Sequence, residues 1–315
     1  MITLKNPSIF SNFSIPASPA LPRTDLACET VGSGSDTAGA VFGEYESGSF
    51  RVCELFVEKG EGEKRTGKKS GTYVTIHCPP VLSLCDAERL DLTDLICKKI
   101  TDLTQRVTGS PVDSSLRILV AGLGNRFISA DSIGPRTADK IAVTSHMRAS
   151  PYESLFERIG CASLSAVHPG VMGQTGIEAA AMIKGACDYV KPHAVIAVDA
   201  LAARSVSRLG CTFQLCDTGI EPGSGIGNRR CRIDRETLGY PVIAMGVPTV
   251  VDCATLIFDA LSRTDLSEKE LESLYPSLEK ERDLFVSPRD CDVVAEELSS
   301  ILANAVNQAF FCEGL

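Results

Sequence analysis

The sequence predicts an α/β fold with a mainly parallel central sheet, helices on both faces of that sheet and an N-terminal β-hairpin extension. From residue 117 onward, short apolar runs alternate with glycine-containing turns and helical patterns, which is typical of units that build a parallel sheet. Before this region, the alternating segments 50–57 and 72–78 flank the hydrophilic stretch 58–71. Two alternating segments around a polar tip indicate a hairpin.

The individual elements follow from the positions of the apolar residues. Apolar residues at helical spacing predict a helix over 86–107 and a C-terminal amphipathic helix over 290–311. Apolar runs predict strands at 117–122, 163–168, 194–199, 211–216 and 241–246, with helices between them at 132–147, 175–190, 200–208 and 249–263. The polar, acidic stretch 264–289 is expected to be an excursion with a short helix.

The chain has 315 residues, enough to bury the core of one large α/β domain. Residues 1–22 contain four prolines and no sustained periodicity, which indicates an extended leader. We therefore expect a leader at 1–22 and a single domain over 23–315.

Charge and hydropathy narrow the classes of partner. The net charge is −9, which disfavours direct binding to nucleic acid because phosphate contacts need a basic surface. The N-terminus lacks a basic region followed by an apolar one, and no apolar run approaches the roughly 20 residues of a membrane span. The sequence predicts a soluble, cytoplasmic protein without membrane contact.

Thirteen cysteines are scattered along the chain, and no C-x-x-C pair occurs. This spacing supports neither a zinc site nor a redox motif. Several of them, such as Cys187 and Cys216, stand inside apolar runs, so we expect small buried side chains in a reducing compartment. No metal site is predicted.

The stretch 117–135 combines a strand, glycines and an acid. The apolar run ends at Gly122-Leu-Gly124-Asn125, a loop follows that carries Asp131, and Gly134-Pro135 closes it. A dinucleotide-binding turn would need a small residue at 127, where Phe127 stands, and a helix that begins at once. The sequence also lacks a P-loop, so no nucleotide or other cofactor is predicted. An acid at the carboxyl end of a strand is where open α/β sheets bind ligands.

Asp131 and Asp199 are the candidate catalytic pair. Asp199 follows the apolar run 194–198, and Asp131 follows another predicted strand, so neighbouring parallel strands would bring both to one edge of the sheet. Two adjacent carboxyl groups do not both ionise easily. The ionised one can then take a proton from water while the neutral one polarises a peptide carbonyl. The alternative is that each aspartate caps a following helix.

Other residues are candidates for lining a cleft. Asn125 and His168 stand near predicted strand ends, and His168 is expected to play a structural or supporting part. Asp217-Thr218-Gly219 resembles the signature of pepsin-like proteases, although that fold is all-β and needs a second copy, so an ordinary turn is favoured. The glycine-rich loop 219–228, with Gly223 and Gly225, either lines a cleft or is a plain connection.

Several blocks together resemble one protein family. They are GLGN at 122–125, D-x-x-G-P at 131–135, HPGVMGQTGIE at 168–178, VIAVDALAARS at 195–205, CDTGIEPGSGIGNRR at 216–230 and PVIAMGVPTVVD at 241–252, with RTDLA at 23–27 and GKKSGTY at 67–73. The chain is similar to germination proteases, the spore endopeptidases of endospore-forming bacteria. Residues 126–133 depart from the usual family loop, which has Thr-Pro before the aspartate and Ala-Leu after it.

The resemblance implies a function. It implies an atypical aspartic endopeptidase that degrades small acid-soluble spore proteins during germination, with catalytic aspartates at Asp131 and Asp199. It also implies a phosphorylase/hydrolase-like fold related to hydrogenase-maturation endopeptidases, a self-processing zymogen with its prosegment within 1–22, a homotetramer, and a place in the forespore or spore core. Two alternatives stay open: a metal-sensing, maturation-type endopeptidase, and a non-enzymatic protein that binds spore proteins.

Overall fold

The structure is a computed structural model that describes residues 24–30, 38–148, 151–227, 230–261 and 284–311, with isolated positions between 264 and 277. The predicted leader at 1–22 lies outside the described residues. The strands are β1 (Ala40–Ser47), β2 (Phe50–Val57), β3 (Gly71–His77), β4 (Arg117–Gly122), β5 (Ser163–Val167), β6 (Ala194–Ala202), β7 (Thr212–Cys216), β8 (Val242–Asp252) and β9 (Phe285–Val286). The helices are α1 (Glu61–Thr66), α2 (Asp86–Thr108), α3 (Ile133–Asp139), α4 (Glu153–Ile159), α5 (Met172–Thr175), α6 (Ala179–Val190), α7 (Arg235–Leu238), α8 (Cys253–Leu261) and α10 (Cys291–Phe310).

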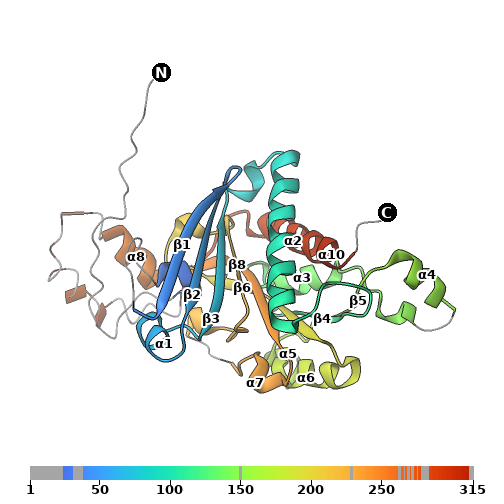
Figure 1. Cartoon of the computed structure of the whole chain (residues 1–315). Coiled ribbons are helices and arrows are strands. Elements are labelled where there is room, and N and C mark those ends of the chain that lie inside the picture. The colour runs from blue at the N-terminus through green and yellow to red at the C-terminus, as the bar shows by residue number, and fades with distance from the viewer. Residues whose placement is uncertain are drawn as a thin grey trace.

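One mixed sheet organises the fold (Figure 1). Its strand order is β1-β2-β3-β7-β8-β6-β4-β5, and β9 pairs with β8 outside this path. Strands β8, β6, β4 and β5 are parallel neighbours. Strands β1, β2, β3 and β7 pair antiparallel, and β7 joins the two halves through its antiparallel contact with β8. The predicted hairpin is therefore part of the central sheet.

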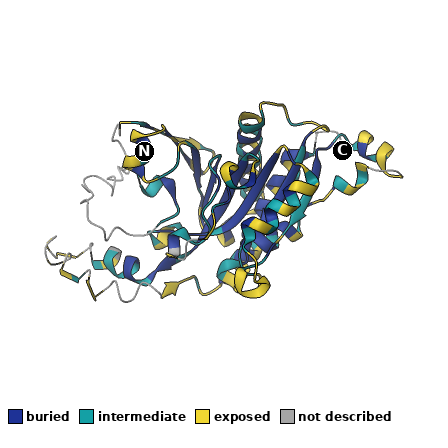
Figure 2. Cartoon of the chain, turned by 90° about the horizontal axis from the view of Figure 1, so that it is seen from below, coloured by how far each residue is buried: buried dark blue, intermediate teal, exposed yellow. Residues whose placement is uncertain are grey.

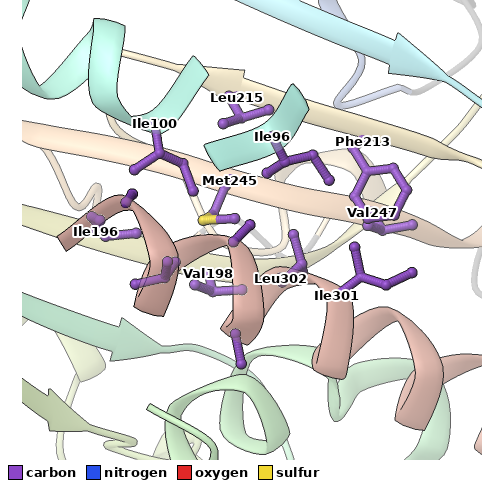
Figure 3. Packing of buried hydrophobic residues seen from close by; sticks show 14 of the residues in the cluster. Ile96, Ile100, Ile196, Val198, Phe213, Leu215, Met245, Val247, Ile301 and Leu302 are labelled. Atoms are coloured by element: carbon purple, nitrogen blue, oxygen red, sulfur yellow. The ribbon is translucent and has the colours of Figure 1, made fainter. Parts of the chain in front are cut away.

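Successive side chains of each central strand point to opposite faces of the sheet and pack into two separate hydrophobic cores. On one face, Ile196 and Val198 of β6 pack with α2 and α10, as Figure 3 shows. On the other face, Val195 and Ala197 of β6 pack with α6 and α7. The predicted α/β fold with helices on both faces is confirmed, and Figure 2 shows the buried strands between more exposed helices.

Two long helices agree closely with the expectation from spacing. The predicted helix 86–107 is α2, and the predicted helix 290–311 is α10. The two helices pack against each other on the same face of the sheet. The predicted strands 117–122, 163–168 and 211–216 match β4, β5 and β7 to within one residue at each end.

Three predicted elements between residues 200 and 263 are wrong in extent. The expected helix 200–208 is replaced by strand, because Ala200 and Leu201 pair with β8, and a 3-10 turn follows only at Val206–Arg208. The strand predicted at 241–246 continues as β8 to Asp252, which delays the expected helix 249–263 to Cys253.

The helices predicted on either side of β5 are also shorter than expected. Gly176, with φ +71°, ends α5 and separates it from α6 within the predicted helix 175–190. The helix predicted at 132–147 ends as α3 at Asp139, because the following chain turns to make tertiary hydrogen bonds. The Ala142 N–H donates to Asn307 Oδ1 (2.9 Å) and the Thr144 N–H donates to the Leu164 carbonyl (3.0 Å).

The N-terminal region holds more structure than a hairpin with a polar tip. The glycine- and serine-containing stretch before residue 50 forms β1, which pairs with β2 along its whole length. The tip between β2 and β3 contains the short helix α1, which begins at Glu61 and is closed by Gly67 in the left-handed region. Nearly half of the predicted excursion 264–289 lies outside the described residues.

Candidate active site

Asp199 lies within β6, beside the point where the parallel and antiparallel halves of the sheet meet. Its side chain is only 5% exposed. In the sheet, Asp199 pairs with Gly246 of β8, and Gly246 pairs with Gln214 of β7. A Cβ on Gly246 would come within 2.4 Å of the Asp199 carbonyl oxygen, so only glycine permits this close pairing.

Asp131 is held at the same edge by the loop after β4, the parallel neighbour of β6. The loop is fastened to β6 because the Leu123 N–H donates to the Val198 carbonyl (2.8 Å). It is also fastened to β8, since the Thr249 hydroxyl donates to the Ala130 carbonyl (2.6 Å). The two acids predicted as a pair are therefore carried by the loop after β4 and by its parallel neighbour β6.

The glycines of this loop permit its close turns. Gly124 has φ +106°, and a Cβ there would lie 2.2 Å from the Asp131 carbonyl oxygen. A Cβ on Gly134 would lie 2.4 Å from the Val198 carbonyl oxygen. Asn125 donates its N–H to Asp131 Oδ2 (2.8 Å). The GLGN and D-x-x-G-P motifs thus fix where the Asp131 carboxylate lies.

The electrostatics separate the two acids. Burial, followed by the negative charges of Asp131 and Asp25, raises the pKa of Asp199 well above its usual range. Burial also raises the pKa of Asp131, but the hydrogen bond from the Asn125 N–H opposes this by favouring the ionised carboxylate. Asp199 is thus the acid that keeps a proton more readily.

The helix-cap alternative for both aspartates is wrong. Asp199 lies inside a strand, and its carboxylate accepts the N–H of Ala200 (2.9 Å). Asp131 precedes α3, but the residue at the cap position is Ser132, and no side chain caps that helix. Neither carboxylate is used to end or begin a helix.

Residues 24–27, which were not predicted to belong to the site, lie against β6. The Asp25 N–H donates to the Ala202 carbonyl (2.9 Å), and the Ala202 N–H donates back to Asp25 Oδ2 (2.9 Å). Ser224 donates its hydroxyl to Asp25 Oδ1 (2.7 Å). Leu26 and Ala27 are fully buried. The RTDLA motif at 23–27 was part of the family resemblance, but nothing in its sequence predicted that it would lie near Asp199.

The remaining predicted residues fall into two groups. Asn125 borders Asp131 through its N–H, whereas Gly225 borders Asp25: a Cβ on Gly225 would lie 2.3 Å from Asp25 Oδ2. Gly223, with φ +73°, turns the chain just before Ser224. His168 pairs with Asp139 of α3 (3.3 Å) and has a supporting contact there. Asp217 accepts the Thr72 N–H (2.7 Å) and so ties β7 to β3.

Neither metal-ligand clusters nor membrane spans are found within the described residues: no three His, Cys, Asp or Glu residues group as a metal site, and no helix is long and apolar enough to cross a membrane.

Cysteines such as Cys78 and Cys216 are buried. Burial raises the pKa of the Cys78 thiol to about 12.

Comparison with known proteins gives the family. A family model described as germination protease matches residues 24–264. A germination protease of Clostridium acetobutylicum is 36% identical over 91% of this chain and 94% of its own length, and one of Priestia megaterium is 31% identical over 96% and 95%. The solved structure of the NiFe hydrogenase maturation protease HycI of Thermococcus kodakarensis is 18% identical, with a TM-score of 0.31 over 63% of this chain and 97% of that one. The chain belongs to the germination protease family.

Proposed function

We propose that this protein is an endopeptidase that degrades small acid-soluble spore proteins through a two-aspartate, water-activating mechanism. One observation carries the proposal: the loop after β4 and the neighbouring parallel strand β6 bear Asp131 and Asp199, and the pKa of Asp199 is raised well above its usual range partly by the charge of Asp131. Such a pair supplies a base and an acid in one site.

The two aspartates take different parts. Asp131, less buried and hydrogen-bonded by the Asn125 N–H, is the ionised base. It accepts a proton from water as the water oxygen bonds to the peptide carbonyl carbon, while Asp199 gives its proton to the carbonyl oxygen. When the C–N bond breaks, Asp131 returns its proton to the leaving nitrogen. One hydroxyl of the tetrahedral carbon gives its proton to Asp199, which restores both acids to their starting states.

The zymogen is part of the proposal. Residues 24–29 lie across β6 and bring Asp25 close enough for its charge to act on Asp199. This segment adjoins the predicted prosegment at 1–22 and contributes to the raised pKa of Asp199, which supports self-processing of the N-terminus as the activating step. A homotetramer, a place in the forespore or spore core, and the absence of direct nucleic-acid contact complete the proposal.

Cleavage of a small acid-soluble spore protein tests this function. We expect Asp131→Asn and Asp199→Asn to lower kcat by several orders of magnitude while circular dichroism and thermal unfolding show a folded chain. The matched control is Asp188→Asn, an exposed carboxylate on α6 that pairs with Lys184 (2.9 Å); its activity should equal that of the unchanged chain. Normal cleavage by either dyad variant would remove that residue from the mechanism.

The metal-sensing alternative is separated in the same assay. The two-aspartate mechanism needs no metal, so a chelator or added nickel should leave the rate unchanged. A rate that falls with chelator and returns with nickel would favour the alternative over the proposed reaction.

A further inference from the structure

We propose that Lys68 and Gln214 bind the main chain of the substrate, and that residues 24–27 occupy their site in this structure. The inference rests on the proposed function, since it assigns substrate-binding residues to the same site. We call these two side chains, with the backbone of β6 at Ala202, the main-chain clamp.

The clamp holds backbone atoms of the segment. Lys68 Nζ donates to the Asp25 carbonyl (2.9 Å) and to the Thr24 carbonyl (3.5 Å). Gln214 donates Nε2–H to the same Asp25 carbonyl (3.0 Å) and accepts the Ala27 N–H at its Oε1 (2.5 Å). The Asp25 N–H donates to the Ala202 carbonyl (2.9 Å). Every polypeptide offers these groups, so the clamp can bind a peptide whatever its side chains.

Because Lys68 and Gln214 are buried, their polar groups need hydrogen-bond partners from a bound peptide segment. Gln214 is only 8% exposed, and both polar ends of its amide are bonded to the segment. Burial also lowers the pKa of Lys68, whose ammonium group donates to two carbonyls of the segment. A buried amide left without hydrogen-bond partners is destabilising. Once the segment leaves, another peptide main chain restores these bonds.

The sheet aligns the clamp with the dyad. Gln214 pairs with Gly246, and Gly246 pairs with Asp199, so the three residues form one row across β7, β8 and β6. Residues in one row share a face, and two strand spacings place Gln214 about 10 Å from Asp199. Gly246 puts no side chain between them. A peptide held by Gln214 therefore lies on the same face as the Asp199 carboxyl group.

Glu29 also holds the segment in place, so changes at Glu29 and changes in the clamp should alter kcat/KM in opposite directions. The Glu29 carboxylate accepts the N–H groups of Arg204 (2.9 Å) and Ser205 (3.4 Å), whereas the Lys68 and Gln214 hydrogen bonds go to residues 24, 25 and 27. Glu29→Gln weakens the segment and leaves the clamp intact. If the clamp binds substrate, this change should raise kcat/KM for a small acid-soluble spore protein severalfold.

Changes in the clamp should act in the other direction. In the full chain carrying Glu29→Gln, we expect Gln214→Glu and Lys68→Met to lower kcat/KM at least tenfold, mainly through a higher KM, because binding is lost in ground state and transition state alike. Lys68→Arg keeps a donor and should restore most of the activity. Clamp variants that match or exceed Glu29→Gln alone would show that the two side chains only anchor the segment, and would overturn the inference.

A binding measurement keeps this test apart from the proposed chemistry. A fluorescein-labelled peptide with the sequence of residues 24–30 should bind the Glu29→Gln chain, and Gln214→Glu should weaken its fluorescence-polarisation affinity at least tenfold. If no variant hydrolyses protein but the peptide binds in this pattern, the clamp stands and the proposed function fails. Equal affinity with and without Gln214→Glu would overturn the clamp whatever the activity.

Discussion

Replacement of Gly124 by alanine should disable the site through geometry alone. Gly124 has φ +106°, and its added Cβ would lie 2.2 Å from the Asp131 carbonyl oxygen and 2.7 Å from Asp131 Oδ1. The unfavourable φ costs about 1–3 kcal/mol of stability. Relief of the contact must also move the Asp131 backbone by on the order of 1 Å, and a misplacement of that size costs about 100-fold in rate.

A control glycine separates the cost of the unfavourable φ from the effect of moving Asp131. Gly109 has φ +69° at the end of α2, with nothing within 4 Å of an added Cβ. Gly109→Ala should lower the free energy of unfolding by about 1–2 kcal/mol and leave cleavage unchanged. Urea unfolding and initial rates on a small acid-soluble spore protein measure both effects. If folded Gly124→Ala cleaves as fast as Gly109→Ala, the position of Asp131 does not govern the reaction.

Three further changes test the surroundings of the dyad. Asp199 has a raised folded pKa, so stability falls as pH rises from the unfolded value of about 3.9 through the folded one; thermal melts should therefore show Asp199→Asn gaining over the unchanged chain as pH rises from 4 to 8. Asp217→Ala leaves the Thr72 N–H unpaired and should cost about 1–2 kcal/mol in urea unfolding without loss of activity; a large loss of activity would return Asp217 to the site. Gly246→Ala, whose Cβ would meet the Asp199 carbonyl oxygen, should lower kcat about tenfold or more, and normal kcat would refute the close-pairing argument.

The parallel half of the fold was predictable because its signals are local. Residues 118–122 of β4 and 194–198 of β6 are apolar throughout, as is typical of strands buried on both faces. Gly124 and Gly134 marked a loop that turns sharply around an acid, and they do approach the backbone too closely for a side chain. The pattern of a buried strand followed by an acid was therefore enough to predict where Asp131 lies.

The rest depended on contacts between distant segments. Residues 200–202 have no strand signal of their own, and their partner is β8, more than forty residues later. The direction of β7 was likewise hidden, since an apolar run looks the same in a parallel and an antiparallel strand. Asp25 reaches Ala202 and Ser224 only after folding, and the motif around it said nothing about its neighbours.

The antiparallel half of the sheet gives the site its open face. Parallel neighbours need a crossover, usually a helix, which then covers one face of the sheet. Strand β7 instead meets β8 antiparallel, and the apolar cluster around Tyr73, Cys216 and Ala244 contains Ala27 but no residue of a described α-helix. The short segment around Ala27 thus lies on the face where a helix would otherwise pack. Its departure would expose a row of the sheet that runs from Gln214 to Asp199, which is the surface that an extended substrate needs.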